Sequence, residues 1–390
     1  MKIHMTVSND SLFQPFAFAN GLTLRNRVVM APMTTWSANA DATISRQELA
    51  WYRARAQGVG LVLTGCTHVQ PNGIGFTDEF AAYDDRFIPS LRQLAEAANS
   101  GGAPAVLQIF HAGNKAVPGL IPEGELVSAS ALAAPKGPFN DGQLVSRALT
   151  HEEILAVIRD FGEATRRAIE AGFDGVELHG AHGFLIQNFL SPLFNQRTDV
   201  WGGSLENRMR FPLEVVREVR RVIATHAQRP FLLGYRVSPE EPGEGALRIG
   251  DALALVDQLI EGGQIDYLHA SLYNLLAGTP QDGAGNLTTA RQFIARVAGR
   301  LPLMAAGEVR TPDEARRALA LGLPLVAVGR GLVMNPQWVE QAKDGRGDEI
   351  DAALDLSRAP GELQVPDKLW AVIQATPGWF PVREAAEEAA

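Results

Sequence analysis

The chain has 390 residues, of which 46% are hydrophobic, and a formal net charge of −9. That length and composition allow a large buried core, and the acidic balance argues against nucleic acid as a partner. A single cysteine, Cys66, excludes a disulfide framework, a four-thiolate zinc site and a cysteine-ligated iron–sulfur cluster. The chain shows no apolar leader and no run long enough to span a bilayer, so we expect a cytoplasmic protein with no membrane partner.

Short apolar runs alternate with amphipathic stretches along most of the chain. This alternation is typical of βαβ units, and eight such runs predict an α/β fold of the closed (β/α)8 TIM-barrel type. The predicted strands are Val28–Ala31, Leu61–Thr64, Ala105–Phe110, Gly175–Leu178, Phe231–Val237, Tyr267–Ala270, Leu303–Ala306 and Leu325–Val328.

Capping signals mark two of the intervening helices. Thr150 with Glu153, and Thr311 with Glu314, have the spacing of a capping box, in which each side chain accepts a hydrogen bond from a free backbone N–H. Gly172 and Gly322 are placed to end these helices.

Two segments depart from the alternation, and a third follows it. Around Asn20-Gly21 the sequence predicts an N-terminal β-hairpin lid on the bottom of the barrel, with Asn-Gly supplying positive φ angles. A long insertion, 113–149, follows the third strand and is expected to be functional. We expect one domain over 1–390, with a core at about 13–340 and a C-terminal extension, 341–390, whose aromatic part packs on the barrel while its last residues fray.

In a parallel barrel the active site lies at the carboxyl ends of the strands. The loops after the seventh and eighth strands are a recurrent phosphate site in this fold, and here they carry Gly307 and Gly329-Arg330. Glycines let backbone N–H groups approach a phosphate, and arginine adds charge and a forked donor. Turn formation alone is the alternative role of these glycines.

Polar groups on two other strands suit a flat, oxygen-rich heterocycle. Arg236 could neutralise its negative charge, and Gln108 could both donate and accept hydrogen bonds. The alternative for Arg236 is a buried ion pair with Glu240 or Glu241.

His179 and His182 follow the fourth strand in an H-x-x-H pattern. They could bind a metal, with Glu177 or His111 helping, or they could donate N–H groups to one substrate oxygen and stabilise the charge that develops there. A metal-dependent barrel hydrolase would also need an H-x-H on the first strand and an Asp on the eighth. Those strands end in Ala-Pro-Met-Thr and Gly-Arg, so we expect no metal site.

Several long stretches together resemble one known family, the Old Yellow Enzyme family of FMN-dependent NAD(P)H oxidoreductases. The resemblance runs from about Phe13 to Trp338 and rests on the segments "LTLRNRVVMAPMTTWS", "QIFHAG", "AGFDGVELHGAHGFLIQNFLSPLFNQRTDVWGGSLENRMRF", "YRVSP", "AAGEV" and "VAVGRGLVMNP". It implies a barrel that binds FMN and reduces the activated C=C bond of α,β-unsaturated carbonyl compounds, with NADH or NADPH as hydride donor.

The resemblance also implies roles for single residues. His179 and His182 would hold the substrate carbonyl oxygen as the catalytic pair, and Trp36, Phe184 and Tyr273 would line the substrate side. The FMN-binding residues would be Pro32, Met33, Thr34, Gly65, Gln108, Arg236, Gly307, Glu308, Gly329 and Arg330, with Glu308 acting through its backbone.

Phe184 departs from the family pattern, in which a tyrosine at this position protonates the α-carbon of the alkene. Three interpretations follow: water or Tyr273 replaces the acid, alkene reduction is slow, or the acceptors are quinones, nitro compounds or flavins that need no such acid. The sequence does not distinguish NADH from NADPH, name the physiological acceptor, or separate a monomer from a homo-oligomer.

Overall fold

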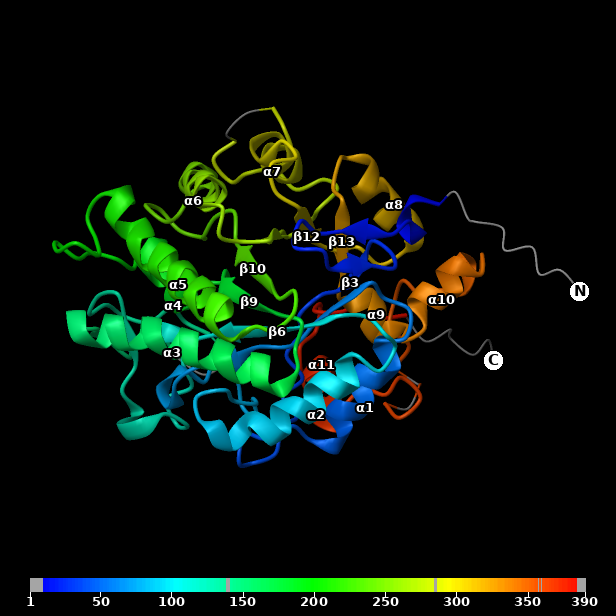
Figure 1. Ribbon diagram of the computed structural model, residues 1–390, viewed down its shortest axis with the longest axis horizontal. Coiled ribbons are helices and arrows are strands. Elements are labelled where there is room, and N and C mark those ends of the chain that lie inside the picture. Colours follow the sequence, from blue (N-terminus) through cyan, green and yellow to red (C-terminus); the bar gives the residue numbers. More distant parts are fainter. Residues whose placement is uncertain (1–9, 138–140, 284–285, 357, 359, 384–390) are drawn as a thin grey trace, which may run out of the picture.

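Eight parallel strands close into a barrel in the computed structural model of the chain (Figure 1), which describes residues 10–137, 141–283, 286–356, 358 and 360–383. Neighbouring strands pair in the order β4, β3, β13, β12, β11, β10, β9, β6, and a further β4–β6 pairing closes the ring. The barrel strands are β3 Val28–Met30, β4 Leu61–Leu63, β6 Ala105–Phe110, β9 Gly175–Gly180, β10 Leu232–Val237, β11 Tyr267–Ser271, β12 Leu303–Ala306 and β13 Leu325–Val328.

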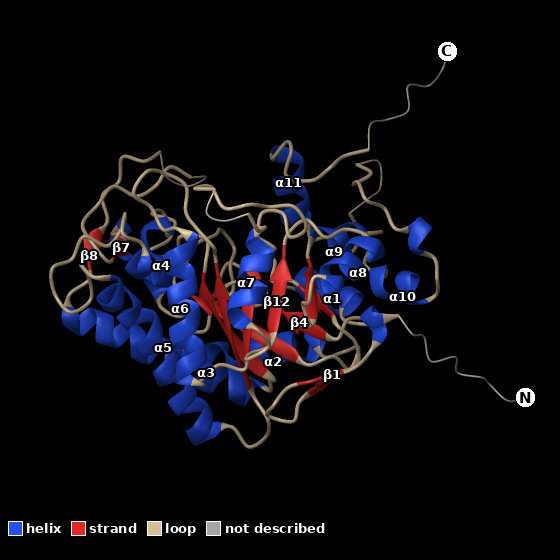
Figure 2. Cartoon of the chain, turned by 90° about the horizontal axis from the view of Figure 1, so that it is seen from above, coloured by secondary structure: helices blue, strands red, loops and turns tan. Residues whose placement is uncertain are grey.

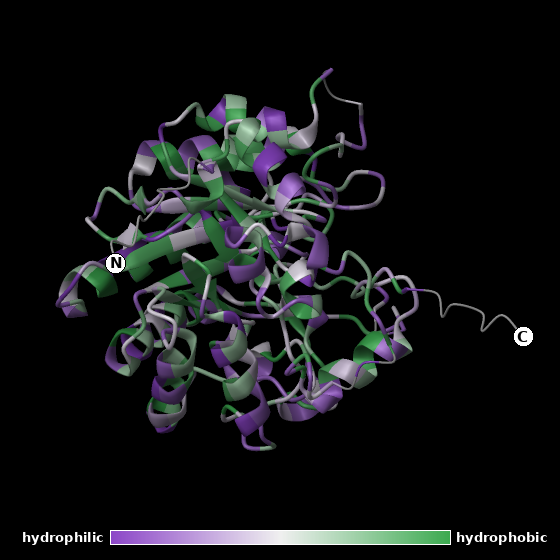
Figure 3. Ribbon diagram, turned by 90° about the vertical axis from the view of Figure 1, so that its right-hand side faces the viewer, coloured by the Kyte–Doolittle hydropathy of each residue, from purple (hydrophilic) through white to green (hydrophobic). Residues whose placement is uncertain are grey.

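All eight predicted strands are present, and the predicted TIM barrel is confirmed. The ends differ slightly: β9 runs two residues past the predicted Leu178, and β10 begins at Leu232 instead of Phe231. Every one of the eight barrel strands is buried on both faces except at one terminal residue of β11 and of β12, as parallel strands covered by helices must be. Figure 3 shows the apolar strands inside and the polar stretches on the outer helices.

Helices surround the barrel on all sides (Figures 1 and 2). They are α1 Arg46–Arg55, α2 Ile88–Ala98, α3 His151–Ala171, α4 Leu185–Leu190, α5 Leu205–His226, α6 Ile249–Gly262, α7 Thr289–Val297, α8 Pro312–Ala320, α9 Arg330–Met334, α10 Trp338–Lys343 and α11 Asp367–Ala375. Short 3-10 turns lie at Ser11–Phe13, Pro71–Gly73, Asp85–Phe87, Gly113–Lys115, Pro122–Gly124 and Gly347–Glu349. None of the helices in these described ranges is long and apolar enough to cross a membrane.

Both predicted capping boxes form. Thr150 Oγ1 accepts from the Glu153 N–H at the start of α3, and the Glu153 carboxylate accepts from the Thr150 N–H. The same exchange links Thr311 and Glu314 at the start of α8. Gly172 caps α3 with a φ of 94°, a left-handed conformation that favours glycine.

The N-terminal hairpin, β1 Phe16–Ala17 and β2 Thr23–Leu24, lies at the end of the barrel where the strands begin (Figure 2). Phe18 is buried there against the ring of Tyr267, and the Asn20 amide reaches the Phe231 carbonyl. The predicted turn needs one correction. Only Gly21 has a positive φ, 92°, whereas Asn20 instead accepts a hydrogen bond from the Leu22 N–H through its side chain.

The insertion and the C-terminal extension both lie toward the opposite end of the barrel (Figure 2). The insertion forms a small parallel pair, β7 Val127–Ser128 and β8 Arg147–Ala148, and its residues 138–140 lie outside the described part. In the extension, Trp370, Ile373 and Phe380 are buried in the same hydrophobic cluster as the residues of the barrel. The predicted fraying concerns 384–390, which lie outside the described residues.

Candidate functional site

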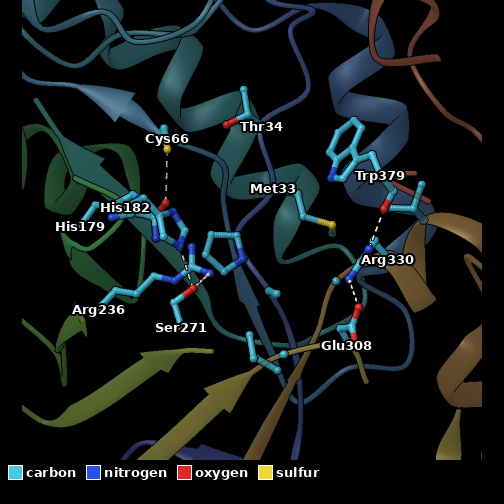
Figure 4. Close-up of a pocket in the computed structure, with 18 of the residues that line it drawn as sticks. Met33, Thr34, Cys66, His179, His182, Arg236, Ser271, Glu308, Arg330 and Trp379 are labelled. Carbon is cyan, nitrogen blue, oxygen red and sulfur yellow. Dashed lines mark hydrogen bonds and ion pairs between the residues drawn. The ribbon is translucent and has the colours of Figure 1, made fainter. Parts of the chain in front are cut away.

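A cavity of about 630 Å³ opens at the carboxyl ends of the barrel strands, and it gathers the predicted site residues from distant parts of the sequence. The predicted residues in its lining are Pro32, Met33, Thr34, Trp36, Gln108, His179, His182, Phe184, Arg236, Tyr273, Gly307, Glu308, Gly329 and Arg330. Figure 4 shows two groups across the cavity, with His182, Arg236 and Ser271 on one side and Glu308, Arg330 and Trp379 on the other.

Gly65 is the predicted site residue that does not line this cavity. Its N–H donates to the Tyr52 hydroxyl at 2.8 Å, and a Cβ at this position would stand 2.5 Å from the Met33 carbonyl oxygen. Gly65 therefore lets the loop after β3, which carries Met33, lie close to the end of β4.

Strand register sets the floor of the cavity. Arg236 on β10 is level with His179 on β9 and with His269 on β11, and Gln108 on β6 is level with Glu177 on β9. Because side chains alternate along a strand, Glu177 and His179 project to the same face.

Glu177 is the anion at the centre of this floor. Its carboxylate accepts from Gln108 Nε2 at 2.7 Å and pairs with His269 Nδ1 at 3.0 Å, and both the Glu177 and His269 side chains have no exposed surface. Burial raises the pKa of Glu177, but the His269 contact and the nearby Arg236 charge outweigh it, so the pKa is lowered and the group is ionised at neutral pH. Sequence analysis considered Glu177 only as a helper for a metal.

Arg236 is buried beside this carboxylate. It does not pair with Glu240 or Glu241, which corrects the alternative considered from sequence: Glu241 accepts from Gln187 and Ser191. Arg236 Nη2 donates to Ser271 Oγ at 3.1 Å, while its Nε is buried with no partner among the described residues. His269 Nε2 is likewise buried with no hydrogen-bond partner among the described residues. Unsatisfied buried polar atoms are rare and often mark a ligand position.

The two site histidines lie together, with 4.9 Å between ring centroids. His179 is buried, and desolvation, with the positive charges nearby, lowers its pKa well below the usual value. His182 faces the open cavity, but desolvation at this crowded site and the charges of Arg236 and Lys115 lower its pKa well below 6.5 as well. Both rings are therefore neutral at pH 7.

The backbone of His182 is held in an unusual conformation. Its φ of 60° and that of Gly183, 71°, are both left-handed. The His182 N–H donates to Ser238 Oγ at 3.0 Å, and Lys115 Nζ donates to the His182 carbonyl at 2.6 Å. A non-glycine residue in this region costs free energy and persists only when its surroundings fix it. Lys115 was not among the predicted site residues, because no local sequence pattern connects it to His182.

Aromatic rings line the cavity beside the histidines. Phe184 is 6% exposed, and its ring stands nearly perpendicular to that of His179 at 4.9 Å. Trp36, Phe76 and Trp379 make edge-to-face contacts at 5.4–5.7 Å. Trp379 comes from the C-terminal extension and was not predicted as a site residue. Tyr273 stands at the rim with 94% of its surface exposed.

On the other side of the cavity Arg330 is already engaged. Its Nη1 donates to the Trp379 carbonyl at 2.6 Å, and its Nη2 pairs with Glu308 at 3.3 Å. Gly307 packs so closely on the loop after β11 that a Cβ would stand 2.8 Å from the Leu275 nitrogen.

Cys66 also lines the cavity. Burial raises the pKa of its thiol, so the group is a protonated thiol rather than a thiolate nucleophile. No group of three or more metal-ligating side chains occurs in the described ranges.

Residues 11–349 match the model of the NADH:flavin oxidoreductase / NADH oxidase family. The chain belongs to this family, the Old Yellow Enzyme family. It is 42% identical over 96% of its length to a probable NADH-dependent flavin oxidoreductase, YqiG, of Bacillus subtilis, and covers 98% of that protein. It is 34% identical to an NADPH dehydrogenase of Geobacillus thermodenitrificans, with 90% and 98% of the two chains covered.

Solved structures agree with this membership. Morphinone reductase superposes with a TM-score of 0.74 at 29% identity, over 87% of this chain and 91% of that one. The Old Yellow Enzyme homologue of Zymomonas mobilis gives 0.72 at 27%, over 86% and 93%. This Old Yellow Enzyme family member is therefore an NAD(P)H-dependent flavin oxidoreductase, and not the metal-dependent hydrolase that the sequence analysis weighed against it.

Proposed function

We propose that the protein is an FMN-dependent oxidoreductase that reduces the activated C=C bond of α,β-unsaturated carbonyl compounds, with His179 and His182 binding the carbonyl oxygen. The observation that carries the proposal is the pair of neutral imidazoles, 4.9 Å apart, that line the same cavity as Arg236 and Arg330. Neutral N–H donors aimed at one oxygen stabilise the negative charge that develops there during hydride addition.

The residues present fit FMN. Arg236 and His269 each keep a buried nitrogen without a partner in the described part of the chain, as expected where a ligand supplies the missing partner. Arg236 Nε–H needs an acceptor, whereas Nε2 of the neutral His269 ring, whose Nδ1–H donates to Glu177, needs a donor. Pro32, Met33 and Thr34 would line the ring, and Gln108 and Arg236 would contact its pyrimidine edge. Backbone N–H groups at Gly307, Glu308 and Gly329, with the Arg330 guanidinium, would hold the phosphate.

Bound FMN would accept a hydride from NADH or NADPH and pass one on to the acceptor. The protein residues supply binding and electrostatics: Arg236 places a buried positive charge beside the flavin ring, and the histidines polarise the acceptor. One neutral hydrogen bond of this kind is worth on the order of 2–4 kcal/mol in a transition state.

Phe184 favours a second candidate, reduction of quinones, nitro compounds or flavins. Its ring occupies the position beside His179 and has no proton to donate. Tyr273, the tyrosine considered as its replacement, is 94% exposed at the rim. Acceptors whose heteroatoms take up protons directly from water would need no such acid.

Two relatives carry substrate names, an NADH:fumarate oxidoreductase of Klebsiella pneumoniae at 37% identity and an NADH:acrylate oxidoreductase of Vibrio harveyi at 35%. This chain spans only 39% and 36% of those proteins. Their substrates therefore do not transfer to it directly. The property that they share with the proposal is NADH as electron donor.

Anaerobic stopped-flow absorbance separates the candidates. We expect the purified, FMN-loaded protein to bleach with NADH or NADPH and to recover its yellow absorbance with 2-cyclohexenone. In a His179→Ala/His182→Ala variant, bleaching should persist while recovery with the enone slows by at least about 100-fold. Recovery only with menadione would replace ene-reduction by quinone reduction, and failure to bind FMN would refute both.

A further inference from the structure

Ser271, at the end of β11, connects the buried cation to one of the site histidines. Its Oγ lies 3.1 Å from Arg236 Nη2 and 2.7 Å from His182 Nε2 (Figure 4). The residue lines the cavity, and no site role follows for it from the family pattern used above.

The hydrogens in this chain of contacts can be counted. A guanidinium only donates, so Arg236 occupies a lone pair of the Ser271 oxygen. The hydroxyl has a single hydrogen, and among the described residues its other hydrogen-bond partner is His182 Nε2. The oxygen has a second lone pair that could accept from an Nε2–H group, but the hydroxyl hydrogen would then have no acceptor among the described residues. The arrangement that satisfies both groups has the hydroxyl donating to Nε2, and because the ring of His182 is neutral, its proton is then on Nδ1.

The neighbouring ring has the opposite arrangement. His179 Nδ1 accepts from the Ala181 N–H at 3.3 Å, which leaves the proton of this neutral ring on Nε2. The Nε2–H group can then donate toward the cavity that His179 lines.

We propose that Ser271 is a positioning residue that fixes the tautomer of His182, so that the acceptor oxygen is met by His179 Nε2–H and His182 Nδ1–H. The tautomer rests on this accounting of donors and acceptors, whereas its consequence for the acceptor rests on the proposed function. Ser271 also joins the acceptor-binding ring to Arg236, the residue that would stabilise a reduced, anionic flavin.

Because other residues hold the backbone of His182 in place, a change at Ser271 should alter the tautomer of the His182 ring and not its position. Ser238 holds its N–H and Lys115 its carbonyl, so the ring stays anchored at the Cα when Ser271 is changed. Loss of the hydroxyl then removes the donor to Nε2 without removing the ring from the cavity, and the Nε2–H form becomes accessible.

Nitrogen-15 NMR of histidine-labelled protein tests the assignment, because protonated and unprotonated ring nitrogens have well-separated shifts. His182→Asn identifies the His182 signals by their loss. We expect Nδ1–H in the wild type and in Ser271→Thr, which keeps a hydroxyl, and a shift toward Nε2–H in Ser271→Ala. Ser100→Ala, an exposed serine remote from the cavity, should leave the His182 signals unchanged.

Kinetics provide the second readout. In Ser271→Ala the KM for 2-cyclohexenone should rise about tenfold, the effect of one misdirected hydrogen bond, with Ser271→Thr restoring it. A wild-type His182 protonated on Nε2, or an unchanged spectrum in Ser271→Ala, would overturn the assignment even if enone turnover is intact. A protein that shows the expected tautomers but no enone turnover would instead refute the proposed function.

Discussion

Phe184 is the residue at which the sequence departs from the family pattern described above. Its ring lies 4.9 Å from that of His179, one of the two residues proposed to bind the acceptor oxygen. In the Phe184→Tyr variant we expect reoxidation of the reduced enzyme by 2-cyclohexenone to accelerate by at least about tenfold, since general acids commonly contribute 10²–10⁴-fold. Stopped-flow measurement of each half-reaction checks this, and reduction by NADH should not change.

Tyr273 provides the matched test of the alternative acid. Because it is 94% exposed at the rim, Tyr273→Phe should leave the rate of enone reduction within about twofold of wild type. A large loss in this variant, together with no gain in Phe184→Tyr, would show that the rim tyrosine moves into the site and supplies the proton.

The neutral histidines predict how acceptor binding depends on pH. An ordinary histidine would gain a proton as the pH falls through about 6.5. The pKa values of His179 and His182 are lowered well below this by desolvation and neighbouring positive charge, so both remain neutral donors. We expect the KM for 2-cyclohexenone to be flat from pH 8 to pH 6. Lys115→Met lacks one of those charges, so the pKa values of the two histidines should rise in this variant. The KM should then begin to increase at a higher pH than in the wild type as the pH is lowered.

At the scale of one element, helix α1 carries a buried carboxyl in its N-terminal cap. Glu48 accepts from the Ser45 N–H and from Thr35 Oγ1, and burial raises its pKa to about 7. The folded state thus holds a proton that the unfolded chain releases above about pH 4.5. The resulting stability is present at low pH and is lost as the pH rises through 7.

Glu48→Gln should remove this dependence, because glutamine keeps the capping box but does not titrate. Relative to wild type, the free energy of unfolding of the variant should increase by up to about 3 kcal/mol between pH 5 and pH 8, since one pKa unit corresponds to ~1.4 kcal/mol. Urea unfolding of both proteins at the two pH values measures the change. Parallel pH dependences would show that Glu48 is ionised throughout.

On strand β10, Gly234 is required by the close packing of a neighbouring ring. The Tyr267 ring of β11 crosses Gly234 so closely that a Cβ there would stand 2.0 Å from its Cζ atom. Gly234→Ala should lower the free energy of unfolding by about 1–3 kcal/mol through overpacking. Gly250→Ala is the control, because its Cβ would meet open space at the start of α6 and should stabilise by about 0.5–1 kcal/mol. Urea midpoints that change equally would refute the packing argument.

For the whole molecule, periodicity and capping signals were sufficient to predict the architecture. The eight strands, the hairpin and both capping boxes depend on neighbours in sequence, so local patterns report them. The strand ends were less accurate, because β9 is prolonged to Gly180 by pairing with β10, a contact that no local pattern contains.

The site could be predicted only in part, and mostly through the family resemblance. Fourteen predicted residues line the cavity because strand ends converge in any such barrel. The sequence did not predict the contacts that the structure shows for Glu177, Lys115 and Trp379. Their partners, His269, His182 and Arg330, are 92, 67 and 49 positions away, which only the folded chain brings together.

The hairpin under the barrel has a consequence for the order of events in turnover. Phe18, Leu24 and Tyr267 seal the end where the strands begin, and the hydrogen-bonded side chains of Glu177 and His269 are buried in the barrel above them. The cavity is therefore entered from the strand-end mouth. Under the proposed function, the nicotinamide and the acceptor would use this one entrance in turn, and we expect a ping-pong sequence in which excess acceptor inhibits by competing with NADH or NADPH for the oxidised enzyme.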